Sequence, residues 1–241
     1  MKAVFHWLVL CVLALIALQL FFVIRIASMA VVAPQSTAFQ RSEAYRIATE
    51  KSRLPWSQQW VGYEQLGDNI KRAVIASEDD SFSYHDGVDW EALEKAWNKN
   101  TKAEQRVAQR PGSPAAKPPK VVGGSTITQQ LAKNLFLSGE RTLLRKGQEF
   151  VLTMLLEHLL SKERILEIYL NSVEWGEGVF GAEAAAQHYY RKPAAKLSAY
   201  EAARLAVMLP RPKYFEKLAG SGYLSSRAGV IAGRMGDAQL P

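Results

Sequence analysis

The segment GGSTITQQLAKN, residues 123–134, contains the features that mark a helix start in this chain. Two glycines precede Thr126, and Gln129 follows it by three residues, which is the spacing of a capping box at a helix N-terminus. Ile127 and Leu131 then recur at helical spacing and indicate one apolar face. The segment therefore predicts an amphipathic helix with a polar, glycine-preceded beginning.

Helical patterns continue on both sides of this segment. The further helices that spacing and capping signals predict cover residues 69–78, 91–99, 141–160, a stretch from 161 onward, 182–190 and 198–208. No alternating pattern of useful strand length accompanies them. The folded part of the chain is therefore predicted to be mainly α.

One stretch, residues 98–120, interrupts the helical patterns. It contains four prolines, among them Pro118 and Pro119, and it carries six basic side chains against Glu104 alone. Prolines and clustered like charges disfavour regular structure, so we expect a mobile basic loop. A second interpretation stays open, in which the segment is a solvated linker without a role of its own.

The amino terminus predicts a membrane segment. Residues 3–24 are apolar except for His6 and Gln19, and as a helix they would span ~33 Å, close to the thickness of a bilayer core. A cleaved signal peptide is the alternative, but its apolar core is usually shorter. We expect an anchor at residues 1–26, a juxtamembrane connector at 27–60 and a folded domain at 61–241. The flanking charges do not determine the orientation.

Composition limits the classes of partner and site. Lysine and arginine total 30 against 23 acidic residues, a net charge of +7 that suggests nucleic acid, an acidic membrane or a phosphate-bearing substrate as partner. Basic residues are not interleaved with aromatic ones as in nucleic-acid-binding proteins, so we expect no nucleic acid. The single cysteine, Cys11, excludes an intrachain disulfide and a cysteine-based zinc site.

Three adjacent acids, Glu78-Asp79-Asp80, follow an apolar helical run. A carboxylate shielded by apolar neighbours has a raised pKa and can act as a general acid or base near neutral pH. The plainer alternative is a solvated acidic end of a helix. His85 lies seven residues after Glu78 and is interpreted as a structural hydrogen-bond donor.

Two further patterns suit an anionic ligand. Free backbone N–H groups at the helix start after Gly124 would favour an anion. Arg141, Arg145 and Glu149 are four residues apart and share one helix face, where two guanidinium groups suit phosphate. An ordinary surface ion-pair ladder is the alternative. Sequence signatures of a nucleotide P-loop, an HExxH zinc site and a G-x-S-x-G serine elbow are absent.

Taken in order along the chain, these segments resemble the signature motifs of the family 51 peptidoglycan glycosyltransferases. The five similar segments are EDDSFSYHDGVD (78–89), GGSTITQQLAKN (123–134), RTLLRKGQE (141–149), KERILEIYLN (162–171) and LSAYEAARLAVMLPRP (197–212). The transpeptidase signatures of bifunctional members, a serine with lysine three residues later and KTG, do not occur. The chain is therefore most similar to the monofunctional members.

The resemblance implies a lysozyme-like, mainly helical glycosyltransferase domain behind a single transmembrane helix. It implies lipid II and the growing lipid-linked glycan strand as substrates, and an inner-membrane protein with its catalytic domain in the periplasm. Glu78 matches the general base and Glu149 the second essential glutamate. The positions that match pyrophosphate-contacting residues are Lys133 and Arg141, and those that match other cleft residues are Ser125, Gln129, Gln130, Asn134 and Arg145.

The sequence gives few indications of cofactors or protein partners. No cofactor is expected to be obligatory, although a divalent cation such as Mg²⁺ or Mn²⁺ could bind beside Glu149 and phosphate. Other cell-wall synthesis proteins are candidate partners. Two alternative functions remain: a lysozyme-like lytic enzyme that cleaves glycan, and a catalytically silent scaffold of the cell-wall machinery.

Overall fold

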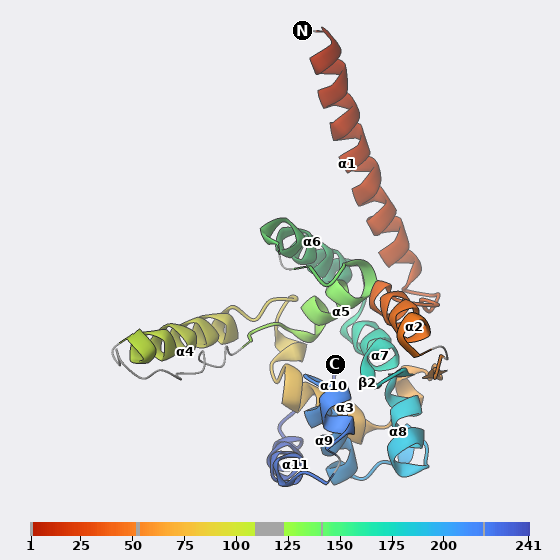
Figure 1. The fold of residues 1–241 in the computed structure, drawn as a ribbon, viewed down its shortest axis with the longest axis vertical. Coiled ribbons are helices and arrows are strands. Elements are labelled where there is room, and N and C mark those ends of the chain that lie inside the picture. Colours follow the sequence, from red (N-terminus) through yellow and green to blue (C-terminus); the bar gives the residue numbers. More distant parts are fainter. Residues whose placement is uncertain (1, 52–53, 109–122, 141, 219) are drawn as a thin grey trace.

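A computed structural model describes residues 2–51, 54–108, 123–140, 142–218 and 220–241 as a mainly helical molecule (Figure 1). Its α-helices are α1 (Lys2–Ser28), α2 (Ala38–Lys51), α3 (Asp68–Glu78), α4 (Trp90–Ala108), α5 (Ile127–Phe136), α6 (Leu143–Leu159), α7 (Lys162–Ser172), α8 (Ala182–Tyr190), α9 (Ala199–Met208), α10 (Pro212–Glu216) and α11 (Gly222–Arg234). Short 3-10 helices occupy Tyr63–Gln65, Phe82–Tyr84 and Ala194–Lys196.

A small sheet completes the domain. Its strands are β1 (Ser57–Gln58), β2 (Glu174–Gly176) and β3 (Val179–Phe180), in the order β1-β3-β2. β3 pairs antiparallel with β2 and parallel with β1. Gly178 connects β2 and β3 at φ +75°, and a Cβ there would lie 1.8 Å from the carbonyl oxygen of Pro55. Only glycine fits this turn, so the sheet holds residues 55–58 against the hairpin.

The core has two connected helical groups. α3 packs against α9, which also packs against α11, while α5 packs against α2, α6 and α7. Tyr169, Trp175 and Phe82 are among the largest fully buried side chains. α3 and α5 carry the Glu78 and Lys133 segments, so this packing brings two of the predicted motifs into one domain.

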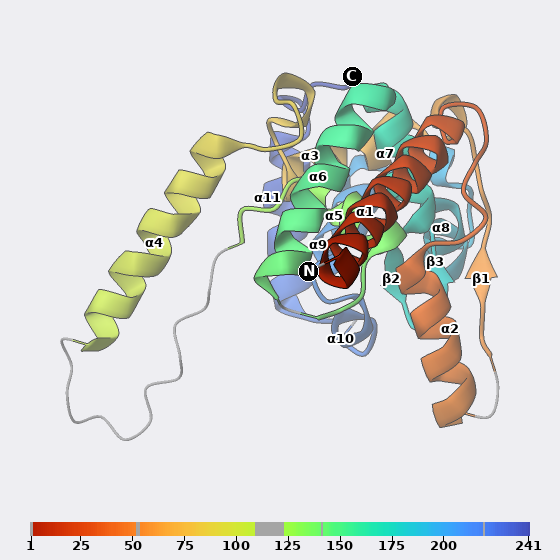
Figure 2. The same cartoon turned by 90° about the horizontal axis from the view of Figure 1, so that it is seen from above.

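The apolar N-terminal helix is confirmed and continues to Ser28. Among the described residues it is the single helix long and apolar enough to cross a membrane. It extends away from the domain in Figure 1 and lies alongside α6 in Figure 2, and the two helices are in contact. Gln19 Nε2 donates a hydrogen bond to Gln148 Oε1 at 3.3 Å, and Phe22 packs edge-on against Phe136 of α5. The anchor therefore contacts the two helices that carry the Lys133 and Glu149 segments.

The connector and the basic segment differ from expectation. The connector contains a helix, α2, which packs on α5 instead of only linking the anchor to the domain. α4 extends beyond Lys99 to Ala108, so the irregular segment does not begin at residue 98 as predicted. The physical reason is that the prolines begin only at Pro111, and lysine, alanine and glutamate before them favour a helix. Residues 109–120 of the expected loop lie outside the described residues. Both views show α4 projecting from the rest of the domain.

Candidate active site

Glu78 is the last residue of α3 and lies where that helix meets α5. Its Oε2 accepts a hydrogen bond from Gln130 Nε2 at 3.1 Å. Burial raises the pKa of the Glu78 carboxyl, the hydrogen bonds from Gln130 and Ser77 oppose that rise, and the negative charge of Asp79 adds to it. Glu78 is therefore a shielded carboxylate suited to accept a proton near neutral pH.

Asp79, the next acid, has a structural role. Its Oδ1 accepts a hydrogen bond from His85 Nε2 at 2.9 Å, because His85 Nδ1 accepts one from the Gly87 amide and leaves the hydrogen on Nε2. Its Oδ2 accepts from the backbone N–H of Ile127 at 2.9 Å. His85 is thus the structural donor that the sequence indicated, and Asp79 fastens the end of α3 to the start of α5.

These contacts correct the interpretation of the α5 N-terminus as a free anion cradle. Thr126 and Gln129 form the predicted capping box, in which each side chain accepts a hydrogen bond from the other residue's backbone N–H. The N–H of Ile127 is taken by Asp79. The positive end of the helix is therefore satisfied by a carboxylate of the protein itself.

A main cavity of about 500 Å³ opens beside α5 and α6. Its walls include seven of the residues that the family resemblance indicated, namely Ser125, Gln129, Gln130, Lys133, Asn134, Arg145 and Glu149. Arg141, predicted to contact pyrophosphate, lies outside the described residues. A small cavity of about 150 Å³ is lined by Glu78 and also by Ser125. Ser125 lines both spaces, so the two cavities adjoin.

The main cavity holds a buried glutamate among cations. Glu149 pairs with Arg145 at 2.8 Å and with Lys146, which confirms the predicted Arg145–Glu149 face of the helix. Partial burial lowers the pKa of Lys133, the charge of Glu149 opposes that effect, and Arg145 and Lys146 add to it. Arg145 Nε is buried without a hydrogen-bond partner. Cations with unused hydrogen-bonding capacity suit a phosphate-bearing ligand.

Gln130 connects the two spaces. Its Oε1 accepts a hydrogen bond from the buried Tyr169 hydroxyl at 2.9 Å, while its Nε2 donates to Glu78. An ionised carboxylate and a backbone carbonyl can only accept, so the N–H₂ group of Gln130 faces Glu78 and the Ser125 carbonyl. The Tyr169 hydroxyl donates to the amide oxygen and so holds Gln130 in this orientation. The sequence did not indicate this role for Tyr169, which lies in the KERILEIYLN segment on α7.

A second buried carboxylate in the main cavity was also missed. Glu174, on β2, lines the cavity and has a side chain that is 4% exposed. No sequence motif singles it out, since it follows the KERILEIYLN segment in a stretch without a helical pattern.

The described residues contain no group of three or more histidine, cysteine, aspartate or glutamate side chains that could hold a metal ion. Glu149 is the carboxylate that faces the cations of the cavity. A Mg²⁺ or Mn²⁺ ion there would take one protein carboxylate and fill its other positions with phosphate oxygens and water, which is a common arrangement for Mg²⁺.

Comparison with known proteins identifies the family of this chain. Residues 46–236 match the transglycosylase family, and the match begins inside the predicted connector. The chain is 54% identical over 228 residues to a biosynthetic peptidoglycan transglycosylase of Burkholderia thailandensis, covering 95% of this chain and 84% of that protein. It is 49% identical over 242 residues to a biosynthetic peptidoglycan transglycosylase of Herminiimonas arsenicoxydans, and the match covers 100% of this chain and 99% of that protein. The family match over residues 46–236 and the identity to these relatives show that the chain belongs to the transglycosylase family of glycosyltransferases.

Proposed function

We propose that this protein polymerises the glycan strand of peptidoglycan from lipid II and releases lipid pyrophosphate. The observation that carries the proposal is the hydrogen bond from Gln130 to Glu78, which places a shielded carboxylate beside a cavity lined by Lys133 and Arg145. The family and its relatives support the same activity.

The proposed step is an inverting transfer. The acceptor 4-hydroxyl attacks the anomeric carbon of the lipid-linked strand, the carbon–oxygen bond to pyrophosphate breaks, and the hydroxyl proton passes to Glu78. Such general-base assistance contributes about 10²–10⁴-fold. Lys133 and Arg145 stabilise the charge that develops on the leaving pyrophosphate, and Arg141 is assigned to the same task from its place in the motif.

Glu149 holds the cations of the cavity in position. Its ion pairs with Arg145 and Lys146 neutralise the buried carboxylate and restrict where the guanidinium and ammonium groups can lie. Fixed charges need no reorganisation when the pyrophosphate leaves, which is the main benefit of a preorganised site. A divalent cation, if bound, would share the phosphate oxygens with Lys133 and Arg145.

α1 anchors the domain beside lipid-bound substrate, and we assign the domain to the periplasmic face of the inner membrane. Docking of α1 on α5 and α6 supports a site close to the bilayer. This removes a three-dimensional search for the substrate. Other cell-wall synthesis proteins remain proposed partners.

The test uses the full-length protein in detergent or vesicles. It is incubated with lipid II, and separately with finished peptidoglycan, with and without a chelator, and the products are separated by length. We expect lipid II to become longer glycan strands and the finished wall to remain intact. Release of fragments from the wall would instead identify a lytic enzyme, and inactivity on both substrates would favour a scaffold.

A further inference from the structure

Glu174 is a buried carboxylate that the proposed mechanism does not use. Its side chain is 4% exposed, and Oε1 has no hydrogen-bond partner. A buried polar atom without a partner is costly, by roughly 1–3 kcal/mol, and such atoms are uncommon in folded proteins. Because Glu174 lines the main cavity, the missing partner can be a ligand that enters there.

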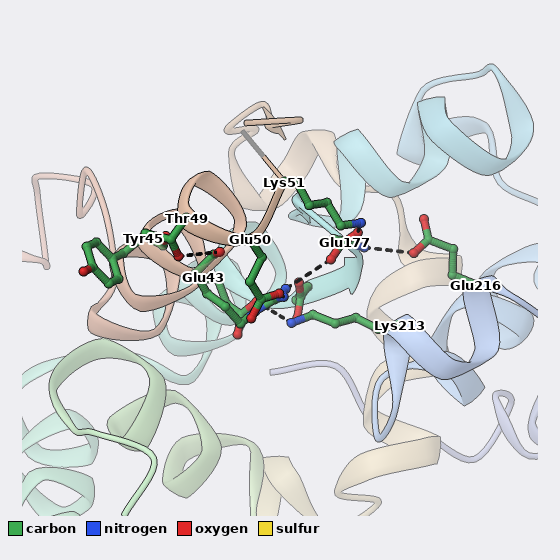
Figure 3. Close-up of polar contacts among 10 residues, drawn as sticks. Glu43, Tyr45, Thr49, Glu50, Lys51, Glu177, Lys213 and Glu216 are labelled. Carbon is green, nitrogen blue, oxygen red and sulfur yellow. Dashed lines mark hydrogen bonds and ion pairs between the residues drawn. The ribbon is translucent and has the colours of Figure 1, made fainter. Parts of the chain in front are cut away.

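Lys213 of α10 holds the other carboxylate oxygen in place. Its Nζ lies 3.6 Å from Glu174 Oε2 and also pairs with Glu43 of α2. Figure 3 shows Lys213 extending from α10 toward Glu43, and Glu177 lying between Lys51 and Glu216. Lys213 is thus the charged partner of Glu174 Oε2, while Oε1 is left without a partner in a side chain that lines the cavity.

The surroundings of Glu174 suit a sugar. Phe39, Val173, Leu209 and two prolines, Pro210 and Pro212, line the same cavity and offer apolar surface for the C–H faces of a sugar ring. Lys133 and Arg145 offer the charge that a diphosphate needs. A sugar attached to that diphosphate must lie within a few bonds of it, and therefore inside the same space.

We infer that Glu174 is a further substrate-contacting residue, whose free Oε1 forms a hydrogen bond with a hydroxyl or amide group of the lipid-linked sugar. This inference rests on the proposed function and adds a residue outside the recognised motifs. It concerns binding of the strand, since Glu174 is not one of the groups that would move the proton or stabilise the leaving pyrophosphate.

Protonation of Glu174 adds a pH signature to this contact. Burial raises the pKa of Glu174 to about 7, Lys213 opposes the rise and Glu43 adds to it. The other charged residues that line the cavity are Glu140, Glu149, Lys133, Arg145 and Lys146. The neutral acid can both donate and accept a hydrogen bond and does not repel an anionic substrate, so substrate binding weakens as the pH rises through 7.

The test compares Glu174→Ala, Glu174→Gln and the control Glu177→Gln in the full-length protein, with lipid II as substrate. Glu177 belongs to the neighbouring ion cluster but does not line the cavity. We expect Glu174→Ala to raise KM about fivefold with kcat within about twofold, as for the loss of one hydrogen bond. Glu174→Gln should keep KM at pH 6 and remove its rise between pH 6 and 8, and Glu177→Gln should match the wild type.

Two outcomes would overturn the inference while leaving the proposed function intact: an unchanged KM in Glu174→Ala, or a Glu174→Gln profile that still rises with pH like the wild type. If Glu174→Ala does not fold, the Glu174→Gln profile decides alone. A wild-type protein that neither binds nor polymerises lipid II would overturn the proposed function together with the inference.

Discussion

Gln130 donates its Nε2 hydrogen to Glu78 Oε2 at 3.1 Å, and through this contact the end of α3 is joined to the helix that lines the main cavity. The relationship links residues 52 positions apart in the chain. The other two acids of the Glu78-Asp79-Asp80 triplet have structural partners. Asp79 accepts a hydrogen bond from the Ile127 amide at the start of α5, and Asp80 pairs with Arg234 at the surface. Of the three, Glu78 remains free to accept a proton.

Replacing Glu78 with glutamine is expected to lower kcat at least 100-fold, because the amide cannot take the proton of the acceptor hydroxyl. Binding of lipid II should persist, since the amide keeps the shape of the carboxyl. Polymerisation and binding are measured separately on the same protein. Asp86→Asn, an exposed acid of the following segment, serves as the control and should keep wild-type turnover. Near-normal kcat in Glu78→Gln would reject the base assignment.

The acid limb of the kcat profile should report Glu78. Its pKa is raised by burial, so turnover falls as the pH falls through a value above 4.5. The hydrogen bond from Gln130 lowers that pKa, so Gln130→Ala should move the limb to higher pH. Tyr169→Phe should also shift the acid limb to higher pH, but by a smaller amount. The Gln130 amide is still present in this variant and has lost only the hydrogen bond that orients it. A limb that stays in place in both variants would contradict the coupling.

Lys133→Met should weaken binding of lipid II about tenfold or more while leaving the thermal midpoint unchanged or slightly raised. The cation contributes to ligand binding, whereas its lowered pKa shows that the folded state disfavours its charge. Affinity and thermal unfolding are measured together. Lys196→Met, at an exposed position, is the matched control. A large drop in thermal midpoint with unchanged affinity would indicate a structural lysine.

The start of α5 should be a stability element. Thr126 caps the helix, and its hydroxyl also donates to the Gly87 carbonyl at 2.7 Å. Thr126→Val removes both contacts inside a buried site, at a cost of about 2 kcal/mol, or a midpoint lower by roughly 5 °C. Thr126→Ser retains the hydroxyl and should lose much less. A larger loss in Thr126→Ser than in Thr126→Val would show that the methyl group, not the hydroxyl, stabilises this junction.

Glu174 should also make stability depend on pH. Its folded pKa of about 7 exceeds the ordinary value of 4.5, so its contribution to stability is full below 4.5 and is lost as the pH rises through 7. Glu174→Gln should therefore gain stability relative to the wild type between pH 5 and 8, on the order of 2 kcal/mol. Thermal unfolding at several pH values measures this difference.

Glu177→Gln should show the opposite sign in the same experiment. Hydrogen bonding to Lys51 is the main cause that lowers the pKa of Glu177, so its ionised form stabilises the fold above its ordinary pKa. The variant should lose stability at neutral pH and approach the wild type in acid. Parallel pH trends in the two variants would contradict the assigned ionisation states.

The sequence alone determined the helical character, the membrane segment and most members of the site. Local signals suffice for these: the capping box at Thr126, the apolar spacing before Glu78 and the unbroken apolar run of α1 depend on near neighbours in the chain. The ordered motifs placed Lys133, Arg145 and Glu149 in one cleft, and they line one cavity. Arg141 stays a prediction.

Only the tertiary structure decided which polar side chains form hydrogen bonds with one another and which face the cavity. That Asp79 fills the α5 N-terminus, that Tyr169 orients Gln130 and that Glu174 faces the cavity all depend on contacts between segments distant in the chain. α2, α10 and α11 likewise carried signals too weak to predict, because their stability comes from packing. The periodicity of the sequence shows which side chains share one face of a helix. Which other segment packs against that face depends on the tertiary structure.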